Sequence, residues 1–349
     1  MKNRNFFKIK NIPIGENYPP VIITELGINH DGDLNKAIYL VDKAIDAGAE
    51  IIKHQTHIAE AEMSDEAKQI IPKHINTSIF EIIKKCSLSE KEEYKLKKYI
   101  ENKKKIFIST PFSFEAVDRL KKFNVPAFKI GSGECNNYPL IDYIAKLKKP
   151  VILSTGMNSI KTIKPSVKIL EKYRVPYVLM HCTNLYPTPN KLIRLQAIRT
   201  LKLNFPKAIV GLSDHSTSIY PCIASVAVGA RVIEKHFTDT KKRKGADISS
   251  SMDFKEHKEL KSAIKIIFDS RGHKKIPVKE EKDTMNFAFA SVVAKRNIKK
   301  NRKLNINDIT LKRPSGGHFG PNDYFSMIGK RVKQNIIQGK RIQKSDFEK

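Results

Sequence analysis

The chain has 349 residues, of which 40% are hydrophobic, enough for a large globular domain and a smaller one. No apolar segment approaches the roughly 18 residues of a membrane span, and the basic first residues lack the apolar segment of a secretory signal. The net charge of +29 suits a nucleic-acid-binding protein, but the lysines alternate with acidic residues, as in 89–105, and no RNA-binding or zinc-finger motif accompanies them. We therefore expect no nucleic-acid partner and no membrane partner.

The four cysteines are widely spaced and form no C-x-x-C pair: Cys86, Cys135, Cys182 and Cys222. This spacing argues against a zinc ribbon or a disulfide scaffold. It predicts reduced thiols and a cytoplasmic location.

Short β-rich segments alternate with helical patterns along most of the chain. The strand candidates are 21–25, 50–55, 105–110, 127–132, 151–155, 177–182, 208–213 and 231–236. The helix candidates are 34–47, 89–104, 114–123, 138–147, 160–173, 191–204, 218–229 and 254–269. This alternation predicts a parallel sheet closed into a (β/α)8 TIM barrel. A doubly wound open sheet is the alternative, but no G-x-G-x-x-G follows the first strand.

The pattern predicts three parts. Residues 1–270 form the barrel domain, of which 1–19 are an N-terminal extension. Residues 271–286 are polar, charged and typical of a linker, and residues 287–349 contain short β-like segments and glycine turns that indicate a small separate domain.

Polar residues gather at the C-terminal ends of the predicted strands, where barrels carry their chemistry. They are Glu25, Lys53, His54, Gln55, Ser109, Thr110, Lys129, Ser132, Glu134, Ser154, Thr155, His181, Asn184, Tyr186, Ser213, Asp214, His215, Glu234 and His236. Two lysines and several hydroxyl groups suit a phosphate or carboxylate, because lysine supplies charge and Ser and Thr supply short donors. For each lysine alone, a solvated surface position is the alternative.

Two histidines end consecutive strands at equivalent heights, His215 and His236. Adjacent parallel strands lie about 4.8 Å apart, so both imidazoles can bind one Mn²⁺, Co²⁺ or Zn²⁺ ion that acts as a Lewis acid. The alternative is a pair of proton shuttles without a metal. We expect Asp214 to orient the ring of His215.

Two carboxylates lie at the same predicted mouth, Glu25 and Glu134. Either can serve as a general acid or base. A salt bridge to Lys53 or Lys129 is the alternative role, and the two roles are compatible.

Taken together, the motifs resemble those of bacterial sialic acid synthases (N-acetylneuraminate synthases). They are ELGINHDG (25–32), IIKHQTH (51–57), STPFS (109–113), KIGSGECNNYPLI (129–141), STGMNS (154–159), HCTNLYPTP (181–189), GLSDH (211–215), EKHFTD (234–239) and FAFASVV (287–293). The resemblance covers nearly the whole chain, and its C-terminal part resembles the antifreeze-like SAF domain of these enzymes.

The resemblance implies condensation of phosphoenolpyruvate with N-acetylmannosamine to give N-acetylneuraminate and phosphate. It implies a Mn²⁺-type ion on His215 and His236, with Co²⁺ or Mg²⁺ as alternatives. The positions matching phosphoenolpyruvate contacts are Lys53, Thr110, Lys129, Ser132, Ser154 and Ser213. The positions matching sugar contacts are Gln55, Asn184, Tyr186 and Asp247, and Glu25 and Glu134 match the acid–base pair. Arg313 matches an arginine that the small domain contributes to the partner subunit, which implies a domain-swapped homodimer.

Several residues depart from the family pattern. Ala246 replaces a proline before Asp247, the loop 240–244 is unusually basic, and Lys73 and His74 stand where the family often has Gly-Asn. These departures affect the sugar side of the site. A sister synthase that makes legionaminate or pseudaminate from a diacetamido-deoxy sugar is therefore the alternative, although KHQTH and GECNNYPL look more like the neuraminate branch.

Overall fold

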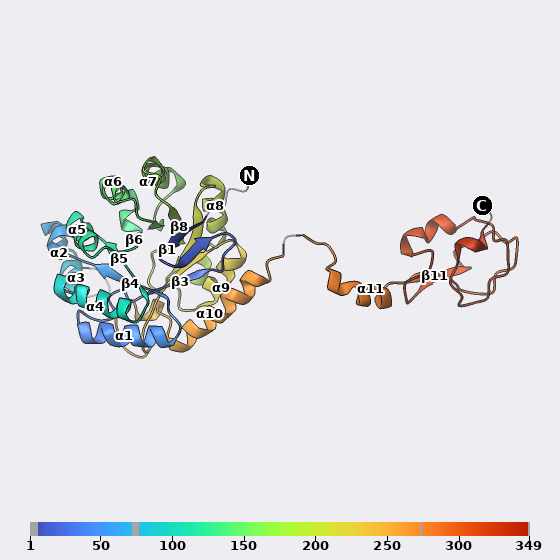
Figure 1. The fold of residues 1–349 in the computed structure, drawn as a ribbon, viewed down its shortest axis with the longest axis horizontal. Helices are drawn as coiled ribbons and strands as arrows, with labels where there is room; N and C mark the ends of the chain where they lie inside the picture. Colours follow the sequence, from blue (N-terminus) through green and yellow to red (C-terminus); the bar gives the residue numbers. More distant parts are fainter. Residues whose placement is uncertain (1–5, 72–76, 273, 348–349) are drawn as a thin grey trace. The chain divides into compact units, whose positions relative to one another are not determined.

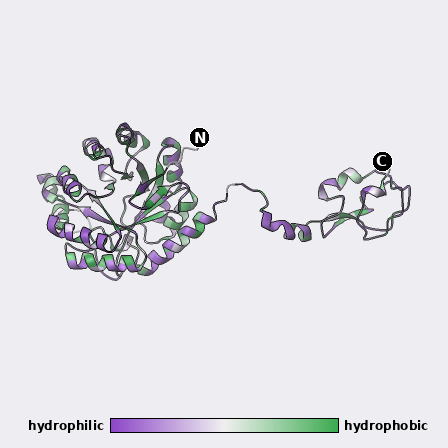
Figure 2. Cartoon of the chain, in the orientation of Figure 1, coloured by the Kyte–Doolittle hydropathy of each residue, from purple (hydrophilic) through white to green (hydrophobic). Residues whose placement is uncertain are grey.

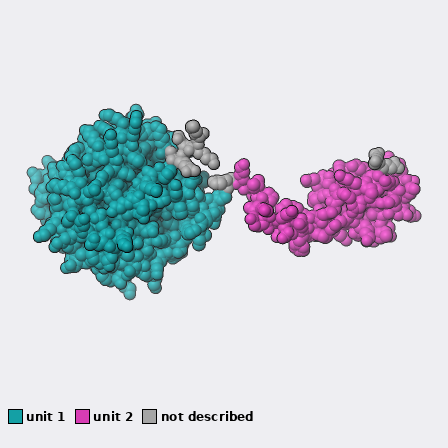
Figure 3. Space-filling model, in the orientation of Figure 1, with its two compact units in different colours: residues 1–272 teal, residues 273–349 magenta. Residues whose placement is uncertain are grey.

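The computed structural model describes residues 6–71, 77–272 and 274–347, so the departures at Lys73 and His74 lie outside the described residues. The chain divides into two compact units (Figure 3). We call residues 1–272 the barrel unit and residues 273–349 the small unit.

Eight parallel strands close into a barrel, which confirms the predicted (β/α)8 fold (Figure 1). They are β3 (Val21–Glu25), β4 (Ile51–Thr56), β5 (Ile106–Pro111), β6 (Phe128–Ile130), β7 (Val151–Ser154), β8 (Tyr177–Cys182), β9 (Ile209–Asp214) and β10 (Val232–His236). Pairing of β10 with both β9 and β3 closes the ring. Each strand begins within one residue of its predicted start, and all but β6, which ends two residues early, also end within one residue of the predicted end.

The eight predicted helices surround the strands. They are α1 (Leu34–Asp46), α4 (Glu90–Asn102), α5 (Phe114–Lys122), α6 (Tyr138–Lys146), α7 (Ile160–Lys172), α8 (Gln196–Asn204), α9 (Tyr220–Ala227) and α10 (Phe254–Asp269). Side-chain caps start several of them, including capping boxes at Ser89, Ser159 and Asp253. Helix α8 begins later than predicted because Arg194 has a φ of 53°, which a right-handed helix excludes.

Two apolar layers hold the barrel together. One lies between strands and helices and the other fills the inside of the barrel. Figure 2 shows hydrophobic residues both in the strands and in the helices. The inner layer includes Ile9 and Ile14 from a hairpin, β1 (Phe6–Ile9) and β2 (Ile12–Gly15), which the sequence did not predict. Because these two side chains pack against the first residues of the barrel strands, the hairpin closes the N-terminal end of the barrel.

The long connection between β4 and α4 contains two further helices that were not predicted, α2 (Ala59–Glu62) and α3 (Ile79–Cys86). The small unit contains α11 (Lys282–Ala288) and an antiparallel pair, β11 (Ser291–Ala294) and β12 (Ile309–Lys312), around a separate apolar cluster. Helix α11 begins inside the segment predicted as a linker. In the described ranges, no helix is long and apolar enough to cross a membrane.

A buried histidine on α10 ties this helix to the sheet. His257 Nδ1 lies 3.2 Å from the carbonyl oxygen of Ala47, and Nε2 lies 2.9 Å from the hydroxyl of Thr24, one residue before Glu25. Burial lowers the pKa of His257 from 6.5 to about 4, so the ring is neutral at pH 7.

We predict that protonation of His257 contributes to acid destabilisation. Its folded pKa lies below its unfolded value, so the stabilisation is complete above pH 6.5 and is lost as the pH falls to about 4. The difference between the two pKa values corresponds to about 3 kcal/mol in the free energy of unfolding. His257→Asn, which keeps a donor near Ala47, should show a shallower decline in the free energy of unfolding between pH 6.5 and 4 than the wild type. Urea unfolding followed by circular dichroism measures both declines, and equal slopes would contradict the prediction.

Candidate functional site

A cavity of about 140 Å³ opens at the C-terminal ends of the strands. It is lined by Glu25, Lys53, Gln55, Thr110, Phe112, Lys129, Gly131, Ser132, Gly133, Ser154, Cys182, Asn184, Tyr186, Ser213, His215, Glu234 and His236. The cavity thus brings together all but three of the residues for which a catalytic or binding role was predicted. Five other polar residues expected at the mouth do not line it: His54, Ser109, Thr155, His181 and Asp214.

Strand register puts the charged residues at one level. His236 of β10 lies opposite Glu25 of β3, and Glu25 lies opposite Lys53 of β4. On the other side of β10, Glu234 lies opposite Ser213. Because alternate residues of a strand point to the same side, Glu234 and His236 both face the cavity.

A buried charge cluster of two lysines and two glutamates forms one wall. Lys53 Nζ lies 2.7 Å from Glu25 Oε2 and 3.8 Å from Glu234 Oε1, and Lys129 Nζ lies 3.6 Å from Glu234 Oε1. All four side chains are at most 7% exposed. A buried charge without a partner is energetically costly, so each of these four side chains can stay ionised only because opposite charges lie beside it.

Hydroxyl groups extend the cluster. Lys53 donates to Thr110 at 3.0 Å and Lys129 donates to Ser154 at 2.7 Å, while Ser213 donates to Glu234 at 3.1 Å. Ammonium and hydroxyl donors held side by side are the groups that bind phosphate and carboxylate oxygens. The arrangement therefore has the chemistry of an anion site.

The pKa values of the two lysines shift in opposite directions. Burial alone would lower the pKa of Lys53, but Glu234 and Glu25 outweigh it and the pKa is raised. For Lys129, burial outweighs the attraction of Glu234 and the pKa is lowered. The pKa of Glu234 is lowered because Lys129 and Lys53 outweigh its burial.

The two predicted histidines lie together beside this cluster. The rings of His215 and His236 have centroids 5.5 Å apart. His215 Nδ1 donates to the carbonyl oxygen of Thr183 at 3.1 Å, so Nε2, 3.0 Å from the Tyr186 hydroxyl, carries the lone pair. Burial, together with the charge of His236, lowers the pKa of His215 to about 4, so the ring is neutral, as a metal ligand must be.

Asp247 approaches His236 from outside the cavity lining, with Oδ2 3.4 Å from Nδ1. Gly27 permits this approach: its φ is +54°, and a Cβ there would lie 2.6 Å from Asp247 Oδ2 and 2.7 Å from His236 Nδ1. The buried Nδ1 of His236 has no hydrogen-bond partner among the described residues.

These features fit a divalent metal held by two histidines. The donor set is one neutral imidazole with an available Nε2, a second imidazole with an unsatisfied buried nitrogen, and a carboxylate nearby. In the described part of the chain, no group of three or more His, Cys, Asp or Glu side chains could hold a metal. The predicted pair would therefore leave the remaining positions to water or substrate.

Three residues with a predicted catalytic or binding role do not line the cavity. Asp247 is absent from the lining but lies 3.4 Å from His236 Nδ1. Glu134 lies in a short 3-10 turn after β6 and accepts a hydrogen bond from the Asn137 amide at 2.6 Å. Arg313 is an exposed residue of the small unit.

Five lining residues had no predicted role: Phe112, Gly131, Gly133, Cys182 and Glu234. Glu234 was expected at the mouth, and it lies two residues before His236 in the same strand and so shares its face. Cys182 Sγ lies 3.6 Å from His215 Nδ1, and burial raises the pKa of its thiol to about 12. A thiol in this state is not a nucleophile at pH 7.

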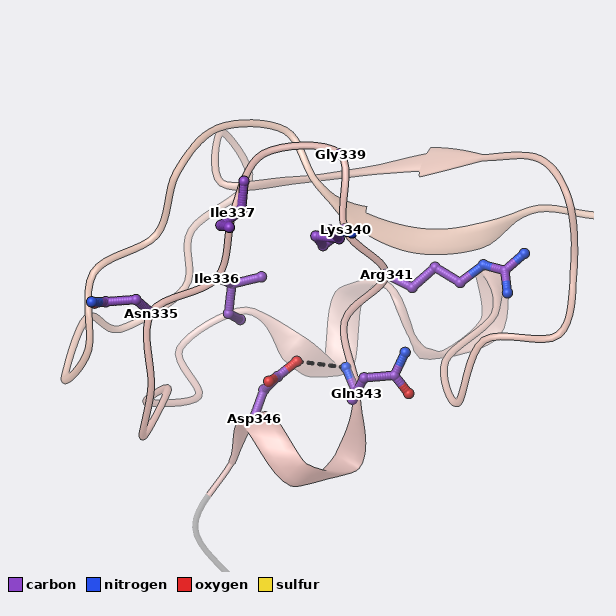
Figure 4. A pocket seen from close by; sticks show the side chains of 8 residues that line it. All are labelled: Asn335, Ile336, Ile337, Gly339, Lys340, Arg341, Gln343 and Asp346. Atoms are coloured by element: carbon purple, nitrogen blue, oxygen red, sulfur yellow. Dashed lines mark hydrogen bonds between the residues drawn. The ribbon is translucent and has the colours of Figure 1, made fainter.

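The small unit has a larger hollow of about 530 Å³ that lacks a comparable cluster (Figure 4). Its one acidic residue, Asp346, accepts a hydrogen bond from the backbone nitrogen of Gln343 at 2.6 Å, and Arg341 extends away from it. Because Asp346 is used in a turn of the backbone, the barrel cavity is the stronger candidate for a site.

Fold and site together define a (β/α)8-barrel protein with an anion site beside a histidine pair at the barrel mouth. A sequence model of the NeuB family matches residues 40–276, and one of the SAF domain matches residues 289–348. The chain belongs to the NeuB family, which confirms the predicted resemblance.

Relatives cover nearly the full length. An uncharacterised protein of Methanocaldococcus jannaschii is 42% identical over 332 residues, which are 94% of each chain. The N,N'-diacetyllegionaminic acid synthase of Campylobacter jejuni is 37% identical over 92% of this chain and 98% of its own. The crystal structure of N-acetylneuraminic acid (sialic acid) synthetase from Leptospira borgpetersenii, in complex with citrate, has a TM-score of 0.74 and 34% identity, covering 81% of this chain and 95% of that one.

The predicted role of Asp214 is wrong. Asp214 points away from the cavity, and its Oδ2 lies 2.6 Å from Nζ of the fully buried Lys235 and 2.8 Å from the hydroxyl of Ser216. Because Ser213 faces inward, its strand neighbour must face outward. The carbonyl of Thr183, not Asp214, holds the His215 ring.

We predict that Lys235→Met lowers the free energy of unfolding by about 3–5 kcal/mol, because it leaves the Asp214 carboxylate buried without its cation. The control is Lys265→Met on α10, which removes an exposed ion pair of 2.5 Å with Asp269 and should cost far less. Denaturant midpoints measure both variants. A loss no larger than that of the control would contradict the structural role assigned to the pair.

Proposed function

We propose that the protein is a phosphoenolpyruvate-dependent sugar acid synthase that condenses phosphoenolpyruvate with N-acetylmannosamine and water to give N-acetylneuraminate and phosphate. The observation that carries this proposal is the pair of buried lysines with their hydroxyl partners beside two histidines at the barrel mouth. Membership of the NeuB family, with a sialic acid synthetase among its similar structures, supports the same reaction.

In this proposal, the phosphate and carboxylate of phosphoenolpyruvate bind the anion site. Lys53 and Lys129 supply positive charge, and the hydroxyl groups supply short donors. The donors are those of Thr110, Ser132, Ser154 and Ser213. The similar Leptospira protein was crystallised with citrate, a polyanion, which is consistent with an anion site in this fold.

The reaction forms one carbon–carbon bond and breaks one bond to phosphate. C3 of phosphoenolpyruvate attacks the aldehyde carbon of the open-chain sugar, and water adds at C2 of the resulting cation. The tetrahedral intermediate then expels phosphate. Between the two candidate carboxylates, we favour Glu25 as the proton acceptor, because it lines the cavity and lies 2.7 Å from Lys53.

His215 and His236 would hold the divalent ion, for which Mn²⁺ is our proposal and Co²⁺ or Mg²⁺ are alternatives. When bound, the ion supplies Lewis-acid polarisation of a carbonyl oxygen. Thr183 fixes the His215 ring by accepting from its Nδ1, and Gly27 lets Asp247 approach His236 closely.

The sugar would contact Gln55, Asn184 and Tyr186, which line the cavity, and Asp247, which lies beside His236. We further propose that Arg313 completes a partner subunit's site in a domain-swapped homodimer. Support for this step is the SAF domain match, since Arg313 lies within it.

A second candidate is synthesis of a diacetamido sugar acid of the legionaminate or pseudaminate type. It is favoured by the Campylobacter relative named N,N'-diacetyllegionaminic acid synthase, at 37% identity over nearly the whole chain. The chemistry at phosphoenolpyruvate would be the same, and only the acceptor sugar would differ.

Incubation of the purified protein with Mn²⁺, phosphoenolpyruvate and one sugar at a time distinguishes these candidates. We expect phosphate release with N-acetylmannosamine, together with a nine-carbon product detected by mass spectrometry. Release only with a diacetamido-deoxy sugar would contradict the neuraminate assignment. No release with any of the sugars would contradict the synthase itself.

We also predict that His236→Ala lowers metal-dependent turnover on the order of 10³-fold, because one of two proposed metal ligands is lost. The matched control is His257→Asn, which alters a buried histidine that does not line the cavity. Turnover is measured against metal concentration, and metal binding is measured separately by calorimetry. Unchanged metal affinity and unchanged turnover in His236→Ala would show that the proposed ligands are wrong.

A further inference from the structure

A chain of hydrogen bonds leads from the cavity into the β4–α4 connection. Gln55 Nε2 donates to Glu25 Oε1 at 2.8 Å, and Gln55 Oε1 lies 3.0 Å from His57 Nε2. On the other side of that ring, His57 Nδ1 lies 3.0 Å from both carboxylate oxygens of Glu62 in α2. His57 and Glu62 are 6% and 5% exposed, and neither lines the cavity.

The donors and acceptors along this chain are fixed by chemistry. The Glu25 carboxylate, paired with Lys53, can only accept, so the nitrogen of the Gln55 amide must face it. The amide oxygen then faces His57, and because it also can only accept, His57 Nε2 must carry a hydrogen. An ionised Glu62 can only accept at Nδ1, and both ring nitrogens of His57 would then be donors.

The ring itself is held in place by stacking. His57 and Phe112 have ring centroids 4.3 Å apart and planes 10° apart, and Phe112 lines the cavity. With the ring plane fixed by Phe112 and one nitrogen fixed by Glu62, the second nitrogen has a defined direction toward Gln55.

We propose that His57 and Glu62 are a positioning pair that fixes the orientation of the Gln55 amide on the acceptor-sugar side of the cavity. A reversed amide would put its oxygen against the Glu25 carboxylate and its NH₂ group against the His57 N–H, which opposes like groups at both ends. The fixed amide keeps one Nε2 hydrogen that has no other acceptor among the described residues, and we assign it to a sugar oxygen. This inference rests on the proposed function, which it deepens by naming how the sugar side is preorganised.

Two variants test the pair without emptying the space it fills. His57→Phe keeps an aromatic ring against Phe112 but donates no hydrogen bond, and Glu62→Gln keeps shape but removes the charge. Each should raise KM for the acceptor sugar about tenfold while KM for phosphoenolpyruvate changes less than about twofold. Glu60→Gln is the matched control, because Glu60 lies on the same helix but pairs with the exposed Lys84 at 2.8 Å.

A double-mutant cycle distinguishes positioning from general packing. If His57 acts through Gln55, then His57→Phe should add little to the KM of a Gln55→Ala enzyme. Full additivity, or equal losses for both substrates, would overturn the proposal. Melting temperatures within the range of the Glu60→Gln control would confirm that the variants are folded.

A measurement independent of turnover keeps this inference separate from the proposed function. In ¹⁵N-histidine-labelled protein, with His57 assigned by its absence from His57→Phe, we expect hydrogens on both ring nitrogens. Glu62→Gln should remove one of them. A singly protonated His57 ring in the wild type would overturn the pair even in an active enzyme, whereas a doubly protonated ring in a protein that uses none of the sugars would contradict only the proposed function.

Discussion

The alternation of side chains along a parallel strand is the constraint on which the site depends. In β4, Lys53 and Gln55 face the cavity. The residues that follow each of them, His54 and Thr56, face the helices. Both outward residues contact the fully buried Glu93 of α4. A register shift of one residue would exchange the two sets, so the contacts that anchor α4 also keep the functional residues inside the barrel.

The same alternation separates two charge clusters on neighbouring strands. On the inside, Glu234 lies between Lys53 and Lys129, and on the outside Lys235 neutralises Asp214. Consecutive residues of β10 therefore serve opposite faces of the sheet, one at the cavity and one beneath α9. Each cluster pairs its own charges, which is the condition for burying them at all.

The pKa directions follow from how these charges are shared. Lys53 contacts two carboxylates, and its pKa is raised although it is fully buried. Lys129 shares a single carboxylate with Lys53, and burial prevails. The opposite pKa shifts of Lys53 and Lys129 follow from their positions around Glu234: Lys53 also contacts Glu25, and Lys129 does not.

Most of the fold and much of the site could be predicted because both follow from periodicity. The strand ends give the polar residues of the mouth directly, and Glu234 follows from His236 by the same rule. Glu134 was misplaced because it lies in a 3-10 turn past the end of β6, where the rule does not apply. Asp214 was misassigned because the rule was not applied to it: it was paired with its strand neighbour His215, although strand neighbours point apart. The β1–β2 hairpin was missed because it precedes the alternation of strands and helices that identified the other strands.

The contacts of Glu25 show why the remaining part could not be predicted. One of its oxygens faces Lys53 at 2.7 Å and the other accepts from Gln55 at 2.8 Å, and both partners are alternate residues of β4. The alternation of one strand predicts that Lys53 and Gln55 both reach Glu25. It does not predict the orientation of the Gln55 amide, which depends on His57 past the strand end and on Glu62 in a four-residue helix. Strand periodicity therefore selects the residues that enter the cavity, while irregular backbone outside the barrel determines which atom of an amide faces the ligand.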